Sequence, residues 1–249
     1  TFFRGLKKLL PGRYLIWQDG KLEIHRYWKP EFHPDESKTL EDWADEIHNT
    51  LKEIMPEVKT ADERVESFLS GGVDSSYVLA MSDAEQADCC GYEEERFDES
   101  VLAEKTAQLL GRKFSRSIIT PEQFFDIVPY VMYNMEQPLG DASAIVFTLG
   151  CNATAEHTKI CYSGEGSDEF FGGYNMYRNA ERYGENLKNF YVGNTNIMKE
   201  DEKQKILKKY DPDVLPIELA RGIYEETEGL DPLTKMSDVD IQIWLEGDI

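Results

Sequence analysis

The sequence predicts an α/β fold, in which helices flank a parallel, twisted sheet and a small N-terminal β-hairpin precedes it. Two observations lead to this prediction. From Arg64 onward, short apolar runs alternate with helical patterns of roughly 10–15 residues, which is typical of βαβ units. Two of the apolar runs end in loops rich in glycine, serine and acidic residues. In open parallel sheets, ligands bind at the loops that follow the carboxyl ends of the strands.

The N-terminal part of the chain predicts a hairpin, a linker and a helix. Two β-rich runs at 12–18 and 21–28 flank Asp19-Gly20, which is a strong signal for a tight hairpin turn. An isolated hairpin is marginally stable, so we expect it to belong to a sheet that is mostly absent or to pack elsewhere. Residues 30–38 are expected to form a linker, and 39–55 a helix with apolar residues at helical spacing. The apolar stripe of this helix comprises Leu40, Trp43, Ile47, Leu51 and Ile54.

The alternating part begins with a short apolar strand that is broken by Ser70-Gly71-Gly72. Gly111 closes one of the later helices, and beyond Gly173 the pattern becomes helical and polar. The expected strands are 65–69, 87–92, 114–119 and 159–162, and the expected helices are 74–81, 100–110, 121–135 and 142–157.

Composition limits the classes of partner. The 249 residues include 27 Lys and Arg against 48 Asp and Glu, which gives a formal charge of −21. This charge argues against nucleic acids and anionic membranes, because both are polyanions. The sequence contains no run of 18 apolar residues, so no membrane span is predicted. No segment has the pattern of a signal peptide. We therefore expect a cytoplasmic protein with one large domain or two small ones.

Cysteines and histidines predict no metal chemistry. The cysteines lack C-x-x-C spacing, and no pair of histidines has the spacing of metal ligands. Buried free thiols in a reducing compartment are the expected state of Cys89, Cys90, Cys151 and Cys161.

The first candidate site is the loop Ser70-Gly71-Gly72-Val73-Asp74-Ser75-Ser76, which follows a strand and opens a helix. Its glycines let the backbone approach a ligand, and the helix start offers unpaired N–H donors and a positive dipole end. Three serine hydroxyls complete a neutral cradle for phosphate oxygens, without the lysine of a Walker loop. Because Asp74 would repel a phosphate, we expect Mg²⁺ to accompany it.

The second candidate site is Ser163-Gly164-Glu165-Gly166-Ser167-Asp168-Glu169, which follows the fourth expected strand. Both loops therefore emerge at carboxyl ends of parallel strands, where ligands bind. Three carboxylates within five residues repel one another unless they share a cation. The segment is thus a second candidate for metal binding.

Together, the two loops resemble the synthetase domain of glutamine-hydrolysing asparagine synthetases, members of the ATP pyrophosphatase superfamily. The first loop resembles the pyrophosphate loop of that superfamily, and the second follows it by 94 residues (Asp74 to Asp168). The likeness extends to Gly91-Tyr92-Glu93, to Met135-Glu136-Gln137-Pro138 and to the hairpin, which resembles the last hairpin of the family's glutaminase domain. The resemblance implies an adenine nucleotide alpha hydrolase-like fold. It implies a glutaminase remnant at 1–30, a linker and helix at 31–59, and a synthetase domain at 60–249.

The resemblance also implies a role for each matching residue, with ATP and Mg²⁺ as cofactors. The adenine is expected at the backbone around Phe68, Leu69 and Cys90. The leaving pyrophosphate is expected on Ser70, Gly71, Gly72, Asp74, Ser75 and Ser76. Ser163 and Gly164 are expected at the ribose or α-phosphate, and Glu165 in forming or using the acyl-adenylate. Asp74 and Asp168 are the expected Mg²⁺ ligands.

The implied reaction forms β-aspartyl-AMP from L-aspartate and ATP, and ammonia from glutamine then gives asparagine. The family's N-terminal cysteine and a later active-site lysine have no match in this sequence, so we expect residues 1–249 alone to be poorly active. Three alternatives stay open: a β-lactam-synthetase-like ligase acting on another carboxylate, another pyrophosphate-releasing ligase, and a non-catalytic nucleotide-binding module. A homodimer is one of several arrangements compatible with the exposed aromatic residues.

Overall fold

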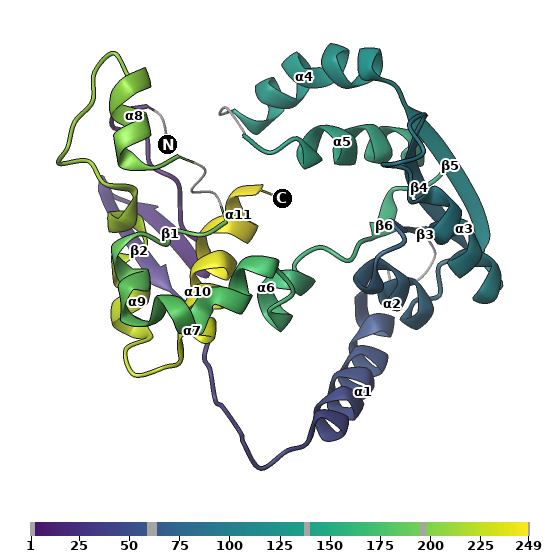
Figure 1. The fold of residues 1–249 in the computed structure, drawn as a ribbon, viewed down its shortest axis with the longest axis horizontal. Coiled ribbons are helices and arrows are strands. Elements are labelled where there is room, and N and C mark those ends of the chain that lie inside the picture. The colour runs from purple at the N-terminus through teal and green to yellow at the C-terminus, as the bar shows by residue number, and fades with distance from the viewer. Residues whose placement is uncertain (1–2, 59–63, 137–139, 195–197, 249) are drawn as a thin grey trace. The chain divides into compact units, whose positions relative to one another are not determined.

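The computed structural model describes residues 3–58, 64–136, 140–194 and 198–248. They form two compact units (Figure 1). The sheet unit comprises Pro34–Glu165, and the helical unit comprises Thr1–His33 together with Gly166–Ile249. The domain boundaries expected at residues 30 and 59 rest on the family resemblance and stay a prediction.

The sheet unit contains the parallel sheet that the sequence predicts. Its strand order is β5-β4-β3-β6, so the chain enters at an inner strand, builds towards one edge and then crosses back to the other. Every adjacent pair in this sheet is parallel, which confirms the predicted fold class. The strands are β3 (Val65–Phe68), β4 (Gln86–Tyr92), β5 (Lys113–Ile119) and β6 (Ile160–Tyr162).

Helices precede or connect these strands, close to their predicted bounds. They are α1 (Leu40–Val58), α2 (Val73–Met81), α3 (Ser100–Leu109), α4 (Pro121–Met135) and α5 (Ser143–Thr154). α4 begins where predicted, because Thr120 and Gln123 form a reciprocal capping box. The apolar stripe expected on α1 is largely uncovered by the described residues: Leu40 is 81% exposed, and Met55 is the residue of α1 that packs against the core.

The two faces of the sheet differ in chemistry. Side chains alternate between faces along a strand, so Val65 and Leu69 point to one side and Glu66 and Phe68 to the other. The first face packs on α2 and α3 in an apolar core. The second face is covered by α5, as the close approach of Gly150 to Phe68 shows. This second face also carries polar residues, among them Gln86, Asp88, Ser115 and Ser117.

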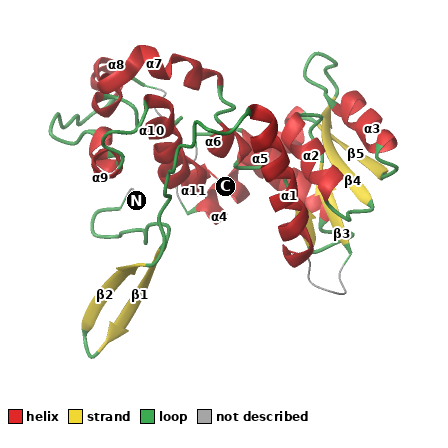
Figure 2. Cartoon of the chain, turned by 90° about the horizontal axis from the view of Figure 1, so that it is seen from below, coloured by secondary structure: helices red, strands yellow, loops and turns green. Residues whose placement is uncertain are grey.

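The helical unit begins with the predicted hairpin of β1 (Arg13–Gln18) and β2 (Lys21–Arg26). Asp19 and Gly20 both have positive φ, as a tight two-residue hairpin turn requires. Figure 2 shows the hairpin projecting away from the helices of its unit. Arg26 fixes its base, donating to Glu226 at 2.6 Å and to Gln242 at 3.2 Å. Within the described residues the hairpin forms a two-stranded sheet of its own.

Short helices build the rest of this unit. Their core includes Tyr177, Leu187, Tyr191, Met236 and Val239. The elements are α6 (Ser167–Phe171), η1 (Asn175–Asn179), α7 (Ala180–Tyr183), η2 (Gly184–Asn189), α8 (Glu200–Ile206), η3 (Pro216–Leu219), α9 (Arg221–Glu226), α10 (Pro232–Val239), η4 (Asp240–Trp244) and α11 (Leu245–Asp248).

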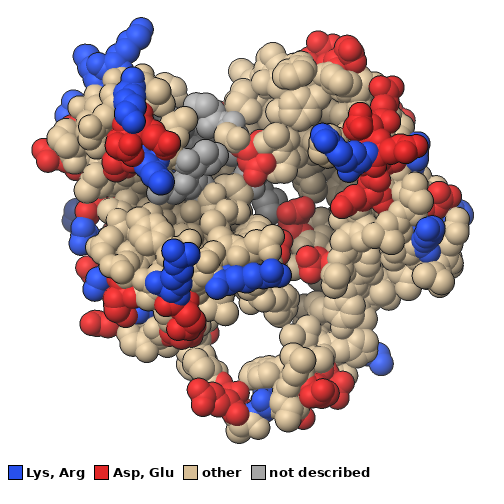
Figure 3. Space-filling model, viewed as in Figure 1, with Lys and Arg blue, Asp and Glu red and all other residues tan. Residues whose placement is uncertain are grey.

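The surface carries many charged side chains. Figure 3 shows Asp and Glu side chains spread over the visible face, with Lys and Arg among them. Within the ranges that the structure describes, no helix is both long and apolar enough to cross a bilayer.

Candidate functional site

The loop after β3 is folded back over the start of α2 by its own serines. The backbone N–H of Ser70 donates to Ser75 Oγ at 3.2 Å, and the two Oγ atoms lie 3.0 Å apart. Ser70 Oγ accepts the N–H of Gly72 at 3.2 Å, while Ser76 Oγ donates to the Gly72 carbonyl at 2.6 Å. The local sequence therefore fixes a compact loop, in which hydroxyls replace missing backbone partners.

Gly71 is required at this turn. Its φ is +90°, a backbone conformation that residues other than glycine rarely adopt. A Cβ there would also lie 3.3 Å from the Glu99 carbonyl oxygen, just before α3. The glycine thus lets the loop leave the strand close to the start of α3.

The second loop lies directly on the first. An added Cβ at Gly164 would be 2.7 Å from the Ser75 backbone nitrogen and 2.9 Å from the Asp74 carbonyl carbon. The sheet order explains this contact, because β6 pairs with β3 in parallel and both strands end at the same edge. The structure therefore brings Gly164, together with its neighbours Ser163 and Glu165, to the Ser70–Ser76 loop. The sequence predicts this for two loops at one edge of the sheet. Ser163 Oγ also accepts the Glu165 N–H at 3.4 Å.

The electrostatics of this edge favour an anion at the helix start. The first-turn N–H groups of a helix have no carbonyl partner within it, and the helix dipole places positive potential there. Asp74 lies exposed in the first turn of α2. Neither Ser70–Ser76 nor Ser163–Glu165 contains Lys or Arg. A polyphosphate here would rely on backbone donors, hydroxyls and a cation at Asp74.

The residues expected at the adenine lie on opposite faces of the sheet. Phe68 and Cys90 face α5: a Cβ on Gly150 would meet Cys90 Sγ at 2.9 Å, and the Phe68 ring lies 5.2 Å from the ring of Phe147. Leu69 points the other way into the core at 1% exposure, and its N–H donates to the Asp88 carbonyl. The Leu69 side chain is therefore not free to contact a ligand.

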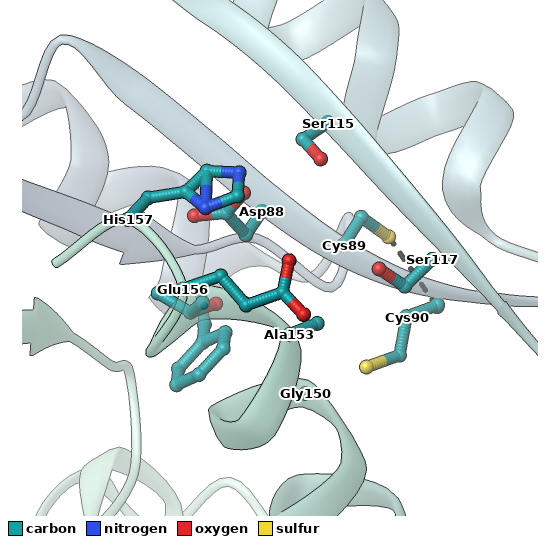
Figure 4. Close-up of a pocket in the computed structure, with 11 residues that line it drawn as sticks. Asp88, Cys89, Cys90, Ser115, Ser117, Gly150, Ala153, Glu156 and His157 are labelled. Carbon is teal, nitrogen blue, oxygen red and sulfur yellow. Dashed lines mark hydrogen bonds between the residues drawn. The ribbon is translucent and has the colours of Figure 1, made fainter.

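Phe68 and Cys90 border a cavity of about 220 Å³ between β4, β5 and α5. Figure 4 shows Asp88, Glu156 and His157 at one end of this cavity and Cys90 and Ser117 at the other. Burial raises the pKa of Cys90 to about 11, so it is a neutral thiol at physiological pH.

A buried carboxyl, Glu66, lies on the same face of the sheet. It is fully buried, and Arg64 Nη2 lies 2.6 Å from its Oε1. Burial, followed by the neighbouring Asp88, raises the pKa of Glu66 to about 7, and Arg64 opposes that rise. The short apolar strand predicted at 65–69 does not account for this buried acid. Glu66, and Asp88 in the neighbouring strand, are each an acidic residue within a predicted strand, which is the signal that the sequence offers.

Asp168 and Glu169 belong to the helical unit, on the five-residue helix α6. Glu169 is 2% exposed and accepts the hydroxyl of Tyr174 at 2.7 Å, so its carboxylate has a protein partner and needs no shared cation. The pairing of Asp168 with Asp74 on one Mg²⁺ stays a prediction, since the two residues lie in different units. Within the described ranges, no group of three or more His, Cys, Asp or Glu residues has the proximity of a complete metal site.

These features define a class of protein. A parallel α/β sheet whose carboxyl edge carries a glycine–serine loop at a helix start has the architecture that is typical of phosphate-binding α/β domains. Residues 46–249 match the Asparagine synthase family, and the chain belongs to that family.

Relatives with curated names agree with this family. Over 286 aligned positions the chain is 29% identical to glutamine-hydrolysing asparagine synthetase 1 of Bacillus subtilis, covering 98% of this chain and 45% of that protein. It is 32% identical to the amidase chry2 of Gibberella zeae, covering 72% of this chain and 30% of that protein. The chain thus spans less than half the length of these relatives. Among solved structures, the glutamine-dependent NAD⁺ synthetase of Acinetobacter baumannii in complex with ADP matches with a TM-score of 0.38 and 18% identity, covering 90% of this chain and 47% of that chain.

Proposed function

We propose that this chain is the synthetase part of a glutamine-hydrolysing asparagine synthetase, which activates L-aspartate with ATP and amidates it with ammonia. The observation that carries the proposal is the contact of Gly164 with the start of α2. That contact joins the family's two characteristic loops at one edge of the sheet. Family membership over 46–249 supports the same conclusion.

The chemistry needs an activated carboxyl, because a carboxylate is a poor electrophile. In the proposed reaction, the β-carboxylate of aspartate attacks the α-phosphorus of ATP and pyrophosphate leaves. Ammonia then attacks the acyl carbon of β-aspartyl-AMP, and AMP leaves as asparagine forms. The protein contributes positioning and charge stabilisation, and no side chain becomes covalently bound.

The loop Ser70–Ser76 is proposed to hold the departing pyrophosphate. The N–H groups at the start of α2 can donate to phosphate oxygens. The Ser76 hydroxyl donates to the Gly72 carbonyl, so it would have to give up that bond to donate to a phosphate. Gly164 and Ser163 are proposed to contact the α-phosphate or the ribose. Glu165, exposed beside them, is proposed to act in forming or using the acyl-adenylate.

Mg²⁺ fits the donors at this edge. Asp74 offers an exposed carboxylate, a hard oxygen ligand, beside a loop that lacks cationic side chains. We propose Asp74 and Asp168 as its protein ligands. When bound, the ion would neutralise charge on the phosphates.

Ammonia is proposed to come from glutamine hydrolysis, the activity that the relatives' names specify. A ligase acting on another carboxylate and a non-catalytic nucleotide-binding module are the competing outcomes. The substrate, the ammonia source and assembly as a homodimer are proposals that rest on the family resemblance.

Calorimetry with Mg·ATP tests the nucleotide site directly. We expect Asp74→Asn to weaken Mg·ATP binding by tenfold or more, whereas Asp126→Asn, an exposed aspartate on α4, leaves it unchanged. Equal affinity in wild type and Asp74→Asn would count against the metal–phosphate role.

Exchange of labelled pyrophosphate into ATP tests the substrate. In a protein that joins this chain to the family's later active-site lysine, we expect exchange to depend on L-aspartate and to be abolished in Asp74→Asn, whereas residues 1–249 alone are expected to exchange only weakly. Exchange driven by a different carboxylate would favour the alternative ligase. Nucleotide binding without any carboxylate-dependent exchange would favour the non-catalytic module.

A further inference from the structure

We infer that Gly173 and the buried Glu169–Tyr174 pair are positioning residues for the carboxylate of Asp168. The inference rests on the proposed function, in which Asp168 binds the metal ion. Its evidence lies wholly within the helical unit.

Gly173 leaves the space that the Asp168 carboxylate occupies. A Cβ at residue 173 would lie 2.9 Å from Asp168 Cγ and closer still to Oδ1. The N–H of Gly173 also donates to the Asp168 carbonyl at 3.0 Å. Any side chain at 173 must therefore push the carboxylate away while the backbone around it is held. Gly173 is needed here for space, since its φ is not in the left-handed region.

Glu169 ties α6 to the elements packed around it. Its buried carboxylate accepts the Tyr174 hydroxyl at 2.7 Å, and Tyr174 Oη accepts the Trp244 Nε1–H at 3.3 Å. The Ser237 hydroxyl donates to the Glu169 carbonyl at 2.5 Å. A buried carboxylate without donors is costly, so these bonds specify one orientation of the helix.

The length of α6 makes this support necessary. A helix of five residues is not stable by itself, because its nucleation cost is not recovered over so few hydrogen bonds. Contacts from α10 and η4 therefore decide where α6 lies. Asp168 is adjacent to Glu169 on this helix, so the same contacts aim its carboxylate.

The experiment measures ATP affinity by calorimetry, once with Mg²⁺ and once in EDTA. The ratio of the two affinities is the metal-dependent gain, which isolates what the metal contributes. We expect Asp168→Asn and Gly173→Ala each to reduce this metal-dependent gain by about tenfold, the range seen for residues that orient metal ligands. Tyr174→Phe should reduce it by a smaller factor. ATP affinity in EDTA should not change in any variant.

Gly222→Ala is the matched control, because a Cβ at Gly222 meets no atom within 4 Å and its φ is not in the left-handed region. It should leave the metal-dependent gain intact. A double-mutant cycle adds a readout that a general structural role does not move: Gly173→Ala should cost nothing further in the Asp168→Asn background.

The outcomes separate the inference from the proposed function. If Asp168→Asn reduces the gain but folded Gly173→Ala and Tyr174→Phe do not, the positioning inference is wrong and the proposed function stands. If Asp168→Asn leaves the gain unchanged, the metal role of Asp168 fails and the inference fails with it. If Gly173→Ala does not fold, Tyr174→Phe, which removes one hydroxyl, decides the matter alone.

Discussion

Gly164 lies so close to Ser75 that a single added carbon would reach within 2.7 Å of the Ser75 backbone nitrogen. These residues are 89 positions apart (75 to 164) and belong to loops that follow adjacent parallel strands. The contact places the glycine of the second loop over the positive end of α2. It is the point at which the two sequence motifs meet.

Gly164→Ala should therefore weaken nucleotide binding while leaving the fold intact. The added methyl group must push the second loop away from α2, which separates the N–H donors at the helix start from Ser163 and Gly164. We expect Mg·ATP affinity to fall by tenfold or more in calorimetry. Gly140→Ala, where a Cβ meets nothing within 4 Å, should have no effect. Unchanged affinity in both variants would mean that the close approach has no part in binding.

Stability should fall as pH rises towards 8 because of Glu66. Its pKa is raised from 4.5 to about 7, so the folded chain keeps a proton on Glu66 that the unfolded chain releases above pH 4.5. The stabilisation from Glu66 is thus fully present below about pH 4.5 and is lost as the pH rises through 7. Thermal or urea unfolding between pH 5 and 8.5 measures this loss, which we expect to be on the order of 2 kcal/mol.

Glu66→Gln should flatten that pH profile, because its side chain does not ionise. Glu85→Gln, at an exposed position just before β4, should keep the wild-type profile. The same slope in Glu66→Gln and wild type would show that another group causes the pH dependence.

The core of the helical unit should depend on Asp240. This residue is fully buried, and its Oδ2 accepts the hydroxyls of Tyr177 at 2.6 Å and Tyr191 at 2.5 Å, while Oδ1 accepts the Asn194 N–H at 2.9 Å. Three donors converge on one carboxylate, so an amide in its place must turn its NH₂ group towards at least one of them.

Asp240→Asn is expected to lower the free energy of unfolding by roughly 2–4 kcal/mol, and Tyr191→Phe by about 1 kcal/mol. Urea denaturation measures both. Asp213→Asn, an exposed aspartate before η3, is the control and should stay within about 0.5 kcal/mol of wild type. If Asp240→Asn left the free energy of unfolding unchanged, the tyrosine hydroxyls would have to find other acceptors.

The amino-acid sequence by itself determined the local elements and the identity of the loops. Strand and helix alternation follows from apolar periodicity, and the Asp19-Gly20 turn follows from the tolerance of those residues for positive φ. The capping box at Thr120 and Gln123 has the same local origin. Each signal depends on residues a few positions apart, which is why it can be recognised without a structure.

The tertiary structure decided which faces are buried and what the buried polar groups meet. Glu66 reads as an interruption of an apolar strand, yet it is fully buried on the face of the sheet that α5 covers. Glu169 reads as one of three acids around a cation, yet Tyr174 and the elements behind it turn its carboxylate inward. Such outcomes depend on which distant segment packs against a residue, because burial and hydrogen bonding are properties of long-range packing and not of local sequence spacing.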